Sequence, residues 1–405
     1  MTGKTGNVIL ISMIIGAIVG VFGGIYLGDF FLSLQFIGTL FLNALKMVVV
    51  PLIVSSMIVG VTNFGDISKL GKTTGKTLLY YFVTTGISVI IGIIVVNIIK
   101  PGVGVDSLGA FVPDIVAQST NKTIVDVLVG LIPSNIISAA SDGKVLPLIV
   151  FSLLFGAVLT TIGDKGKPVI QFFDGLNTAI MKLVNWIIYF APIGVMALIG
   201  GIVAENRYSL TELLSSLAWY SITVILGLLL HAVIIIPLLL KFFGKRKPME
   251  YFLHMGQALT TAFTTASSSA TLPITMECVE EKNNVDERAS SFVLPLGATI
   301  NMDGTALYEA VAAIFIAQIY GIELSFTQQI LIFLTATLAS IGAAGIPHAG
   351  TVTMVLVLDA VRLPLEGIGL IWAIDWFLDR CRTTVNVWGD SVGAVIIAET
   401  KEFKN

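Results

Sequence analysis

The chain has 405 residues, of which 55% are hydrophobic and only 12% are charged. A soluble domain carries about 25% charged residues, so an apolar solvent must cover much of this protein, which predicts a membrane protein. The net charge of −3 gives no reason to expect a nucleic-acid partner. Two cysteines and three scattered histidines indicate neither a disulfide framework nor a zinc site.

Six apolar stretches occupy the chain before residue 248. Each is long enough to cross about 30 Å of hydrocarbon as a helix. Pro133 and the polar residues 138–144 interrupt the fourth stretch, so we expect shorter pieces there. The stretches cover residues 8–27, 34–62, 77–99, 124–162, 169–203 and 212–241.

Positively charged residues gather after every second apolar stretch. Loops on the cytoplasmic side of a membrane carry an excess of lysine and arginine. The pattern therefore predicts a multi-pass protein of the cytoplasmic, or plasma, membrane with both termini in the cytoplasm. The charged groups are Lys69, Lys72 and Lys76, then Lys165 and Lys167, then Lys241, Lys245, Arg246 and Lys247.

The composition of the chain changes after residue 248, where small and polar residues occur inside otherwise apolar segments. Residues 260–271 are rich in Thr and Ser, and residues 339–350 are rich in Gly and Ala. Non-helical backbone at membrane depth is tolerated only where protein or water covers it, so we expect two re-entrant hairpins. The first hairpin is expected over 249–280, followed by a helix over 287–318. The second hairpin is expected over 327–358, followed by a helix over 364–398.

This unit of a hairpin and a polar helix occurs twice. Broken helices at corresponding positions of two repeats point to a transporter's substrate site near the middle of the membrane. The predicted fold is an all-α polytopic membrane protein with eight transmembrane segments, two re-entrant helical hairpins and inverted repeats.

The last predicted helix carries a charged face. An intramembrane charge costs about 2.5–3.5 kcal/mol even on a lenient insertion scale, which favours a functional role. Arg382 is suited to a substrate's side-chain carboxylate, and Asp379, one turn earlier, to its ammonium group. The alternative is a salt-bridge network that only locks helices together. The residues on this face are Asp375, Asp379, Arg382, Thr383, Asn386 and Asp390.

Asn301, Thr305 and Glu309 form an i, i+4, i+8 stripe on the preceding polar helix, while Asp303 faces elsewhere. Carboxylate, amide and hydroxyl oxygens suit sodium, because hard cations prefer oxygen ligands. Helix N-termini at the hairpin tips favour an anionic α-carboxylate. The alternative for residues 301–305 is a helix kink relieved by polar side chains.

Four segments in this half of the chain resemble the dicarboxylate/amino acid:cation symporters, a family that contains the archaeal aspartate transporters and the animal excitatory amino-acid transporters. The resemblance is dense over residues 255–398 and fainter but collinear before that. The segments are SSSATLP at 267–273, GATINMDGT at 297–305, ASIGAAGIP at 339–347 and DRCRTTVN at 379–386.

The resemblance implies a homotrimer in which each protomer works by an elevator mechanism. A scaffold of spans 1, 2, 4 and 5, residues 8–62 and 124–203, would hold the trimer together. A transport domain would carry the substrate through the membrane lipid. This domain comprises span 3, residues 74–99, and residues 212–398, which contain span 6, both hairpins and spans 7 and 8.

The function implied is sodium-coupled uptake of glutamate or aspartate, with no enzymatic activity and no cofactor beyond the coupling ions. The implied substrate contacts are Ser268, Met302, Thr305, Ile346, Gly350, Asp379, Arg382, Thr383 and Asn386. One implied sodium site comprises Gly297, Asn301, Asn386 and Asp390. A second comprises Thr299, Ser340, Ile341 and Ala343, and a third Tyr81, Thr84, Thr85, Asn301 and Asp303. From the residues alone, an interfacial aromatic belt is the alternative for 80–85.

Three positions depart from the archaeal pattern. Ala266 stands where the archaeal members have arginine, and Arg380 lies in the last helix, as in the animal members. Glu309 replaces an archaeal glutamine. Burial favours a neutral carboxyl, and animal members with this glutamate co-transport protons and return with potassium. We therefore expect proton co-transport and potassium counter-transport that depend on Glu309 and Arg380. The alternative is that Glu309 pairs with Arg380 or another buried cation. His348 is unexplained and is expected at a hairpin tip.

Other functions stay open at this stage. A neutral amino-acid carrier of the same fold would lack Arg382, and a C4-dicarboxylate carrier would not need Asp379. A channel is a further class. A membrane-embedded hydrolase is disfavoured because the serines at 267–269 have no histidine in their segment. The sequence does not separate aspartate from glutamate or fix the ion stoichiometry.

Overall fold

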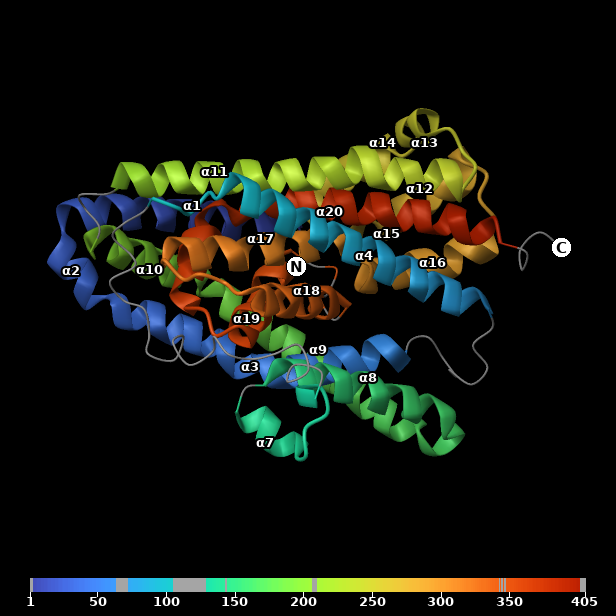
Figure 1. Ribbon diagram of the computed structural model, residues 1–405, viewed down its shortest axis with the longest axis horizontal. Helices are drawn as coiled ribbons and strands as arrows, with labels where there is room; N and C mark the ends of the chain where they lie inside the picture. The colour runs from blue at the N-terminus through green and yellow to red at the C-terminus, as the bar shows by residue number, and fades with distance from the viewer. Residues whose placement is uncertain are drawn as a thin grey trace.

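The computed structural model describes residues 3–62, 72–104, 129–142, 144–205, 210–341, 343, 345 and 347–400. Within these ranges every regular element is helical (Figure 1). The first helices are α1 Gly3–Tyr26, α2 Gly28–Ser33, α3 Gln35–Thr62, α4 Lys72–Ile99, α7 Ile136–Ser141, α8 Val145–Thr161, α9 Lys167–Tyr189 and α10 Ala191–Glu205. The later helices are α11 Leu210–Leu230, α12 Ile236–Phe242, α13 Pro248–His254, α14 Gly256–Thr265, α15 Ser268–Glu277, α16 Glu287–Ile300, α17 Asp303–Ile319, α18 Phe326–Ile341, α19 Ala349–Ala360 and α20 Ile368–Ala398.

Several segments can cross a membrane. In the part of the chain that the structure describes, four helical segments are long and apolar enough by length and composition. A further candidate is bent, because Gly163–Tyr189 and Ala191–Ala204 meet at 53°. The protein is thus an all-helical membrane protein, while the number of eight spans stays a prediction. The four segments are Gly28–Thr62, Gly75–Ile99, Thr211–Phe242 and Glu287–Ile319.

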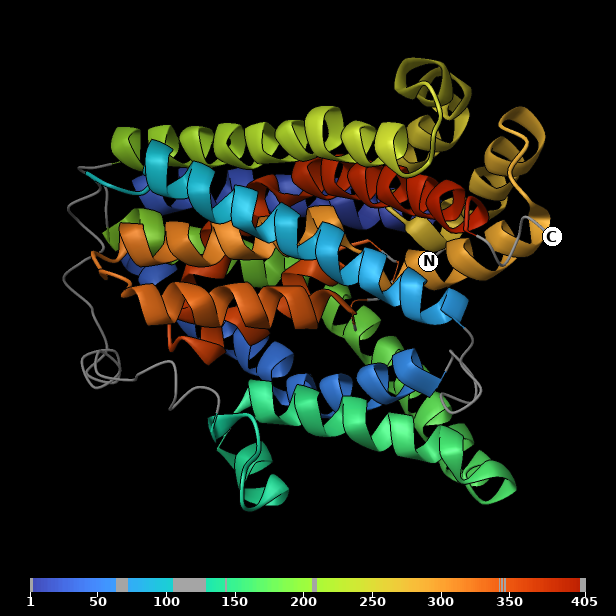
Figure 2. The same cartoon turned by 45° about the vertical axis from the view of Figure 1, so that its right-hand side comes forward.

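Small residues bring α1 and α10 into close contact. A Cβ at Gly20 would lie 2.7 Å from the carbonyl oxygen of Met196, and a Cβ at Gly24 would lie 2.6 Å from that of Gly200. Small residues let the backbones of membrane helices approach in this way. The helix α3 packs against α8, α9 and α10, and Figure 2 shows α8 beside part of α3, away from α11 and α20.

The helix α17 lies at the centre of the second half of the chain. All of its residues except Gln318 are buried, and it packs against α4, α11, α18, α19 and α20 (Figures 1 and 2). A helix that is buried on every side can hold polar groups that a lipid-facing helix cannot. This buried position allows α17 to hold the polar side chains of Asp303, Thr305 and Glu309 away from lipid.

The helix that the sequence predicted over 287–318 is broken at Asn301 and Met302. Their φ and ψ angles are −101° and 80°, and −111° and 61°, so α16 ends before them and α17 begins after them. The stripe predicted through Asn301, Thr305 and Glu309 is thus interrupted between Asn301 and Thr305. The break leaves backbone carbonyls at the end of α16 outside the helical hydrogen-bond pattern.

Two helix pairs lie where the sequence predicted hairpins. In the first, α14 meets α15 at Ala266, whose φ of 49° is left-handed; in the second, His348, with φ of 63°, precedes α19. The two tips touch, because the Ser267 hydroxyl donates to the Gly345 carbonyl at 2.6 Å and the Ser269 N–H donates to the same oxygen at 3.2 Å. The tips thus form one composite element, and the helices on either side of it pack against α17 and α20.

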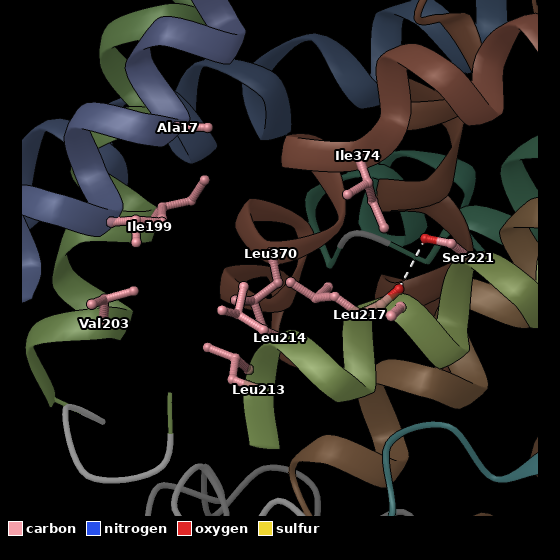
Figure 3. A pocket seen from close by; sticks show the side chains of 11 residues that line it. Ala17, Ile199, Val203, Leu213, Leu214, Leu217, Ser221, Leu370 and Ile374 are labelled. Carbon is pink, nitrogen blue, oxygen red and sulfur yellow. Dashed lines mark hydrogen bonds between the residues drawn. The ribbon is translucent and has the colours of Figure 1, made fainter. Parts of the chain in front are cut away.

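An apolar cavity of 290 Å³ lies between α1 and α10 on one side and α11 and α20 on the other (Figure 3). Ile199 and Val203 line one side, and Leu214, Leu217 and Leu370 line the other. The one hydroxyl in the lining, that of Ser221, donates to the Leu217 carbonyl of its own helix at 2.9 Å. No lining side chain therefore fixes α11 or α20 against α1 or α10 by a polar bond across this cavity.

Candidate functional site

Arg382 is the centre of a buried ionic cluster. Its side chain is 1% exposed, its Nη1 lies 2.8 Å from Asp375 Oδ1, and its Nη2 lies 2.8 Å from Asp379 Oδ1. The guanidinium also lies over the Tyr308 ring of α17, 4.0 Å from the ring centroid. A planar guanidinium suits both contacts, because it forks onto carboxylates and stacks on aromatic faces.

Glycine lets the second hairpin approach this cluster. A Cβ at Gly350 would lie 2.8 Å from Thr305 Cγ2 and 3.2 Å from Arg382 Cζ. Any larger residue would displace the guanidinium or the hairpin. Gly350, Thr305, Asp379 and Arg382, which the sequence proposed as substrate contacts, are thus brought together by α17, α19 and α20.

Asn386 links α20 to the start of α17. Its Oδ1 accepts from the Gly304 N–H at 2.8 Å, and its Nδ2 donates to the Thr305 hydroxyl at 3.2 Å. Thr383, one turn earlier, is also buried, and Met302 lies in the break between α16 and α17. Ser268 is the first residue of α15 and is buried. The predicted contact Ile346 lies outside the described residues.

A second polar cluster surrounds the break in the α16–α17 pair. Asn301 Nδ2 donates to Asp390 Oδ1 at 2.9 Å, and the Thr84 hydroxyl donates to Asn301 Oδ1 at 3.3 Å. A Cβ at Gly297 would collide with the Asp390 carboxylate and lie 3.1 Å from the Tyr81 hydroxyl. Gly297, Asn301 and Asp390 of the first predicted sodium site therefore lie close together, and Asn386, the fourth residue, lies one turn before Asp390 on α20.

The third predicted sodium site adjoins the second cluster. The Thr85 hydroxyl donates to Asp303 Oδ1 at 2.7 Å, and Asp303 Oδ2 lies 3.0 Å from His231 Nε2. The Tyr81 hydroxyl donates to the Val293 carbonyl at 2.7 Å, and Tyr81 is 2% exposed. The alternative of an aromatic belt at the membrane surface is therefore wrong, because this part of α4 faces α16, α17 and α20.

The second predicted sodium site lies at the end of α18. The Ser340 hydroxyl donates to the Thr337 carbonyl at 2.9 Å, and the Ala343 N–H donates to the Ser340 carbonyl at 3.3 Å. A Cβ at Gly345 would collide with the Ala298 carbonyl, which precedes Thr299. Thr299 and the C-terminal end of α18, which includes Ile341, thus belong to neighbouring backbone segments, whose carbonyls are the expected ligands.

Two further residues take positions that the sequence left undecided. The Thr353 hydroxyl of α19 donates to Glu309 Oε1, so among the described residues the partner of Glu309 is the second hairpin rather than Arg380. Arg380 Nη1 instead donates to the carbonyls of Phe263 and Thr264, at 2.9 Å and 2.6 Å. A cation at the C-terminal end of α14 is favourable, and it lies next to Ala266.

Sequence reasoning missed several residues of these clusters. His231, Tyr308, Thr351 and Thr353 all contact predicted site residues, and all four are buried. A signal existed for His231, since an imidazole inside an apolar stretch needs a polar partner. The threonines gave none, because a threonine in a membrane helix usually bonds to its own backbone.

The fold and these clusters define a helical membrane protein with a buried charged cluster that the second hairpin contacts. Residues 9–400 match the sodium:dicarboxylate symporter family, and the chain belongs to this family. The family consists of symporters, so the protein is a transporter and not an enzyme.

The chain is similar along most of its length to animal proteins. It is 41% identical to excitatory amino acid transporter 3 of Oryctolagus cuniculus, over 96% of this chain and 85% of that protein. It is 40% identical to excitatory amino acid transporter 3 of Homo sapiens, over the same shares of the two chains. It is 43% identical to excitatory amino acid transporter 1 of Ambystoma tigrinum, over 90% of this chain and 76% of that protein.

Proposed function

We propose that the protein takes up an acidic amino acid, glutamate or aspartate, together with sodium ions. The observation that carries the proposal is Arg382, a buried guanidinium that faces Gly350 at a hairpin and has Asp379 beside it. The side-chain carboxylate of an acidic amino acid pairs well with a forked guanidinium. The names of the relatives, excitatory amino acid transporters, support the same substrate class.

The substrate has three charged groups, and the Arg382 cluster and the hairpin tips would offer a partner for each. Arg382 would bind the side-chain carboxylate and Asp379 the ammonium group. The α-carboxylate would lie between the hairpins, near Ser268 and the start of α19. Thr305, Met302, Thr383 and Asn386 would complete the contacts, and Ile346 and Gly350 would supply the backbone of the second tip.

Sodium would bind at three places beside the substrate. Asp390, Asn301, Asn386 and the Gly297 carbonyl would form one site, and Asp303 with Tyr81, Thr84, Thr85 and Asn301 another. The remaining site, the second of those predicted from the sequence, would use Thr299 and the backbone oxygens of Ser340, Ile341 and Ala343. Because Asn386 would serve both a sodium ion and the substrate, sodium and substrate would bind cooperatively, which couples their transport.

Proton and potassium coupling would depend on Glu309, with Arg380 setting the charge near the first hairpin. Glu309 is fully buried and shares a hydrogen bond with Thr353 of the second hairpin. A group in that position would bind a proton with the substrate and release it on the inner side. Potassium would then be carried on the return step.

The transport step would be an elevator movement in a homotrimer of the plasma membrane, with both termini in the cytoplasm. Residues 8–62 and 124–203 would form the scaffold, and residues 74–99 and 212–398 the moving domain. The apolar cavity in Figure 3 supports this division. It lies between helices of the two proposed domains, and no lining side chain bonds across it.

Substrate selectivity tests the proposal. In proteoliposomes, we expect saturable uptake of L-aspartate or L-glutamate that excess unlabelled serine or succinate does not inhibit. Inhibition by serine alone would favour a neutral amino-acid carrier, and inhibition by succinate alone a C4-dicarboxylate carrier.

A further inference from the structure

His348 contacts both carboxylates of the Arg382 cluster, although no part of the proposed substrate recognition uses it. Its Nδ1 lies 3.1 Å from Asp375 Oδ2, and its backbone N–H donates to Asp379 Oδ2 at 2.9 Å. Asp375 is fully buried and His348 is 8% exposed. One residue of the second hairpin thus binds the two groups that position the guanidinium.

The backbone of His348 makes this double contact feasible. Its φ of 63° is left-handed, which is uncommon for a residue other than glycine. The turn allows the N–H and the imidazole of one residue to reach two carboxylates that are one helical turn apart on α20. Left-handed geometry is costly unless the surroundings maintain it, and these two contacts supply such surroundings.

Asp375 divides its two oxygens between Arg382 and the hairpin. Oδ1 accepts from Arg382 Nη1 at 2.8 Å, whereas Oδ2 accepts from His348 Nδ1 and from the Thr351 hydroxyl at 2.9 Å. Arg382 Nη2 also donates to Oδ2, but over 3.5 Å. The second hydrogen bond of the bidentate pair that arginine and a carboxylate usually make is therefore long.

We propose that His348 is a positioning residue for substrate recognition, which holds Asp375 Oδ2 so that the second hydrogen bond of the Asp375–Arg382 pair stays long. In this arrangement the guanidinium keeps donor capacity for the substrate's side-chain carboxylate. Without the imidazole donor, Asp375 turns toward Nη2 and competes with the substrate for the same nitrogen atoms. This inference rests on the proposed function, because it concerns how an acidic substrate is bound.

Two substitutions at His348 separate the effect of its side-chain hydrogen-bond donor from the effect of its left-handed backbone. In His348→Asn, the amide nitrogen can occupy the place of Nδ1, and asparagine tolerates left-handed φ. In His348→Gly, the left-handed backbone is kept and the donor is lost. A hydrogen bond to a charged group is lost only in the second variant, so its KM for L-aspartate should rise by about 10- to 100-fold.

Thr351→Val is a second, independent variant. It removes the other hairpin donor to Asp375 Oδ2 and leaves the backbone of His348 unchanged. It should raise the KM for L-aspartate in the same direction, by about tenfold. The variant keeps the test decisive should His348→Gly fold poorly, which size-exclusion chromatography in detergent would reveal.

The experiment measures initial rates of L-aspartate uptake into proteoliposomes at saturating sodium. We expect a raised KM with Vmax within about twofold for His348→Gly and Thr351→Val, and a KM near that of the unmodified protein for His348→Asn. An unchanged KM in the folded Gly and Val variants, or an Asn variant as impaired as Gly, would overturn the inference. If the unmodified protein takes up only L-glutamate, the same KM comparison is made with L-glutamate; failure to take up either amino acid would instead overturn the proposed function.

Discussion

Thr353 on α19 donates a hydrogen bond to Glu309 on α17, so the second hairpin and the central buried helix share a carboxyl group. The other carboxyl oxygen, Oε2, is buried and has no hydrogen-bond partner among the described residues. An ionised carboxylate with an unpaired buried oxygen is costly, whereas a neutral carboxyl is much less so. The geometry therefore favours a protonated Glu309 when the hairpin lies against α17.

The first prediction concerns Glu309→Gln, which fixes the neutral form. Exchange of internal for external substrate should persist, because the variant imitates the protonated state that moves with substrate. Net uptake should lose its dependence on external pH and its stimulation by internal potassium. The measurement compares exchange and net uptake in proteoliposomes between about pH 6 and pH 8.

Glu366→Gln is the matched control, since Glu366 is exposed and precedes α20. It should leave both modes of uptake unchanged. If uptake by the unmodified protein responds neither to internal potassium nor to a proton gradient, proton and potassium coupling through Glu309 is refuted. Sodium would then be the one ion that drives uptake.

The second prediction is that Arg382→Cys abolishes uptake of acidic amino acids and admits serine or alanine. Removing one partner of a buried charge pair costs about 3–5 kcal/mol, and here both Asp375 and Asp379 lose their cation. Arg362→Cys, at an exposed position after α19, is the control. Near-normal affinity for aspartate in Arg382→Cys would exclude the proposed role of the guanidinium.

The third prediction uses the aromatic face beneath the guanidinium. Tyr308→Phe keeps the ring and should retain affinity for acidic substrate, whereas Tyr308→Leu loses the cation–π contact. A desolvated contact of this kind is worth about 2 kcal/mol, so the KM should rise by roughly 10- to 30-fold. Equal KM values for the Phe and Leu variants would show that the ring does not help to position Arg382.

The fourth prediction concerns sodium. Asp390→Asn should raise the sodium concentration needed for half-maximal uptake and also weaken substrate affinity, because linked sites change together. Asp303→Asn should raise the sodium requirement at the neighbouring site. Asp164→Asn, at an exposed turn before α9, should change neither. Unchanged sodium dependence in both site variants would refute the assignment of the ion sites.

Much of this arrangement could be predicted from the sequence, because the cost of burying charge restricts where charges occur. The polar face of α20 and the positions of the two helix pairs follow from residue spacing and from glycine and proline content. The break at Asn301 was harder to place, since the polar residues 301–305 fit a continuous helix as well as an interrupted one. Only the fold shows which alternative holds.

The partners of individual side chains could not be predicted in the same way. His348 occupies a hairpin tip, as expected, but its contacts with Asp375 and Asp379 depend on a left-handed φ that local sequence does not dictate. Thr353 on α19 forms a hydrogen bond with Glu309 on α17, although α18 separates these two helices in the sequence. Such pairings are set by tertiary packing rather than by local spacing.

Sodium-coupled uptake of an acidic amino acid can be measured by imposing one ion gradient at a time on proteoliposomes that contain the purified protein. L-aspartate or L-glutamate should accumulate above its external concentration when sodium is higher outside, and this accumulation should cease when choline replaces external sodium. Accumulation that persists without sodium, or a sodium gradient that drives no acidic amino acid inward, would refute sodium-coupled uptake.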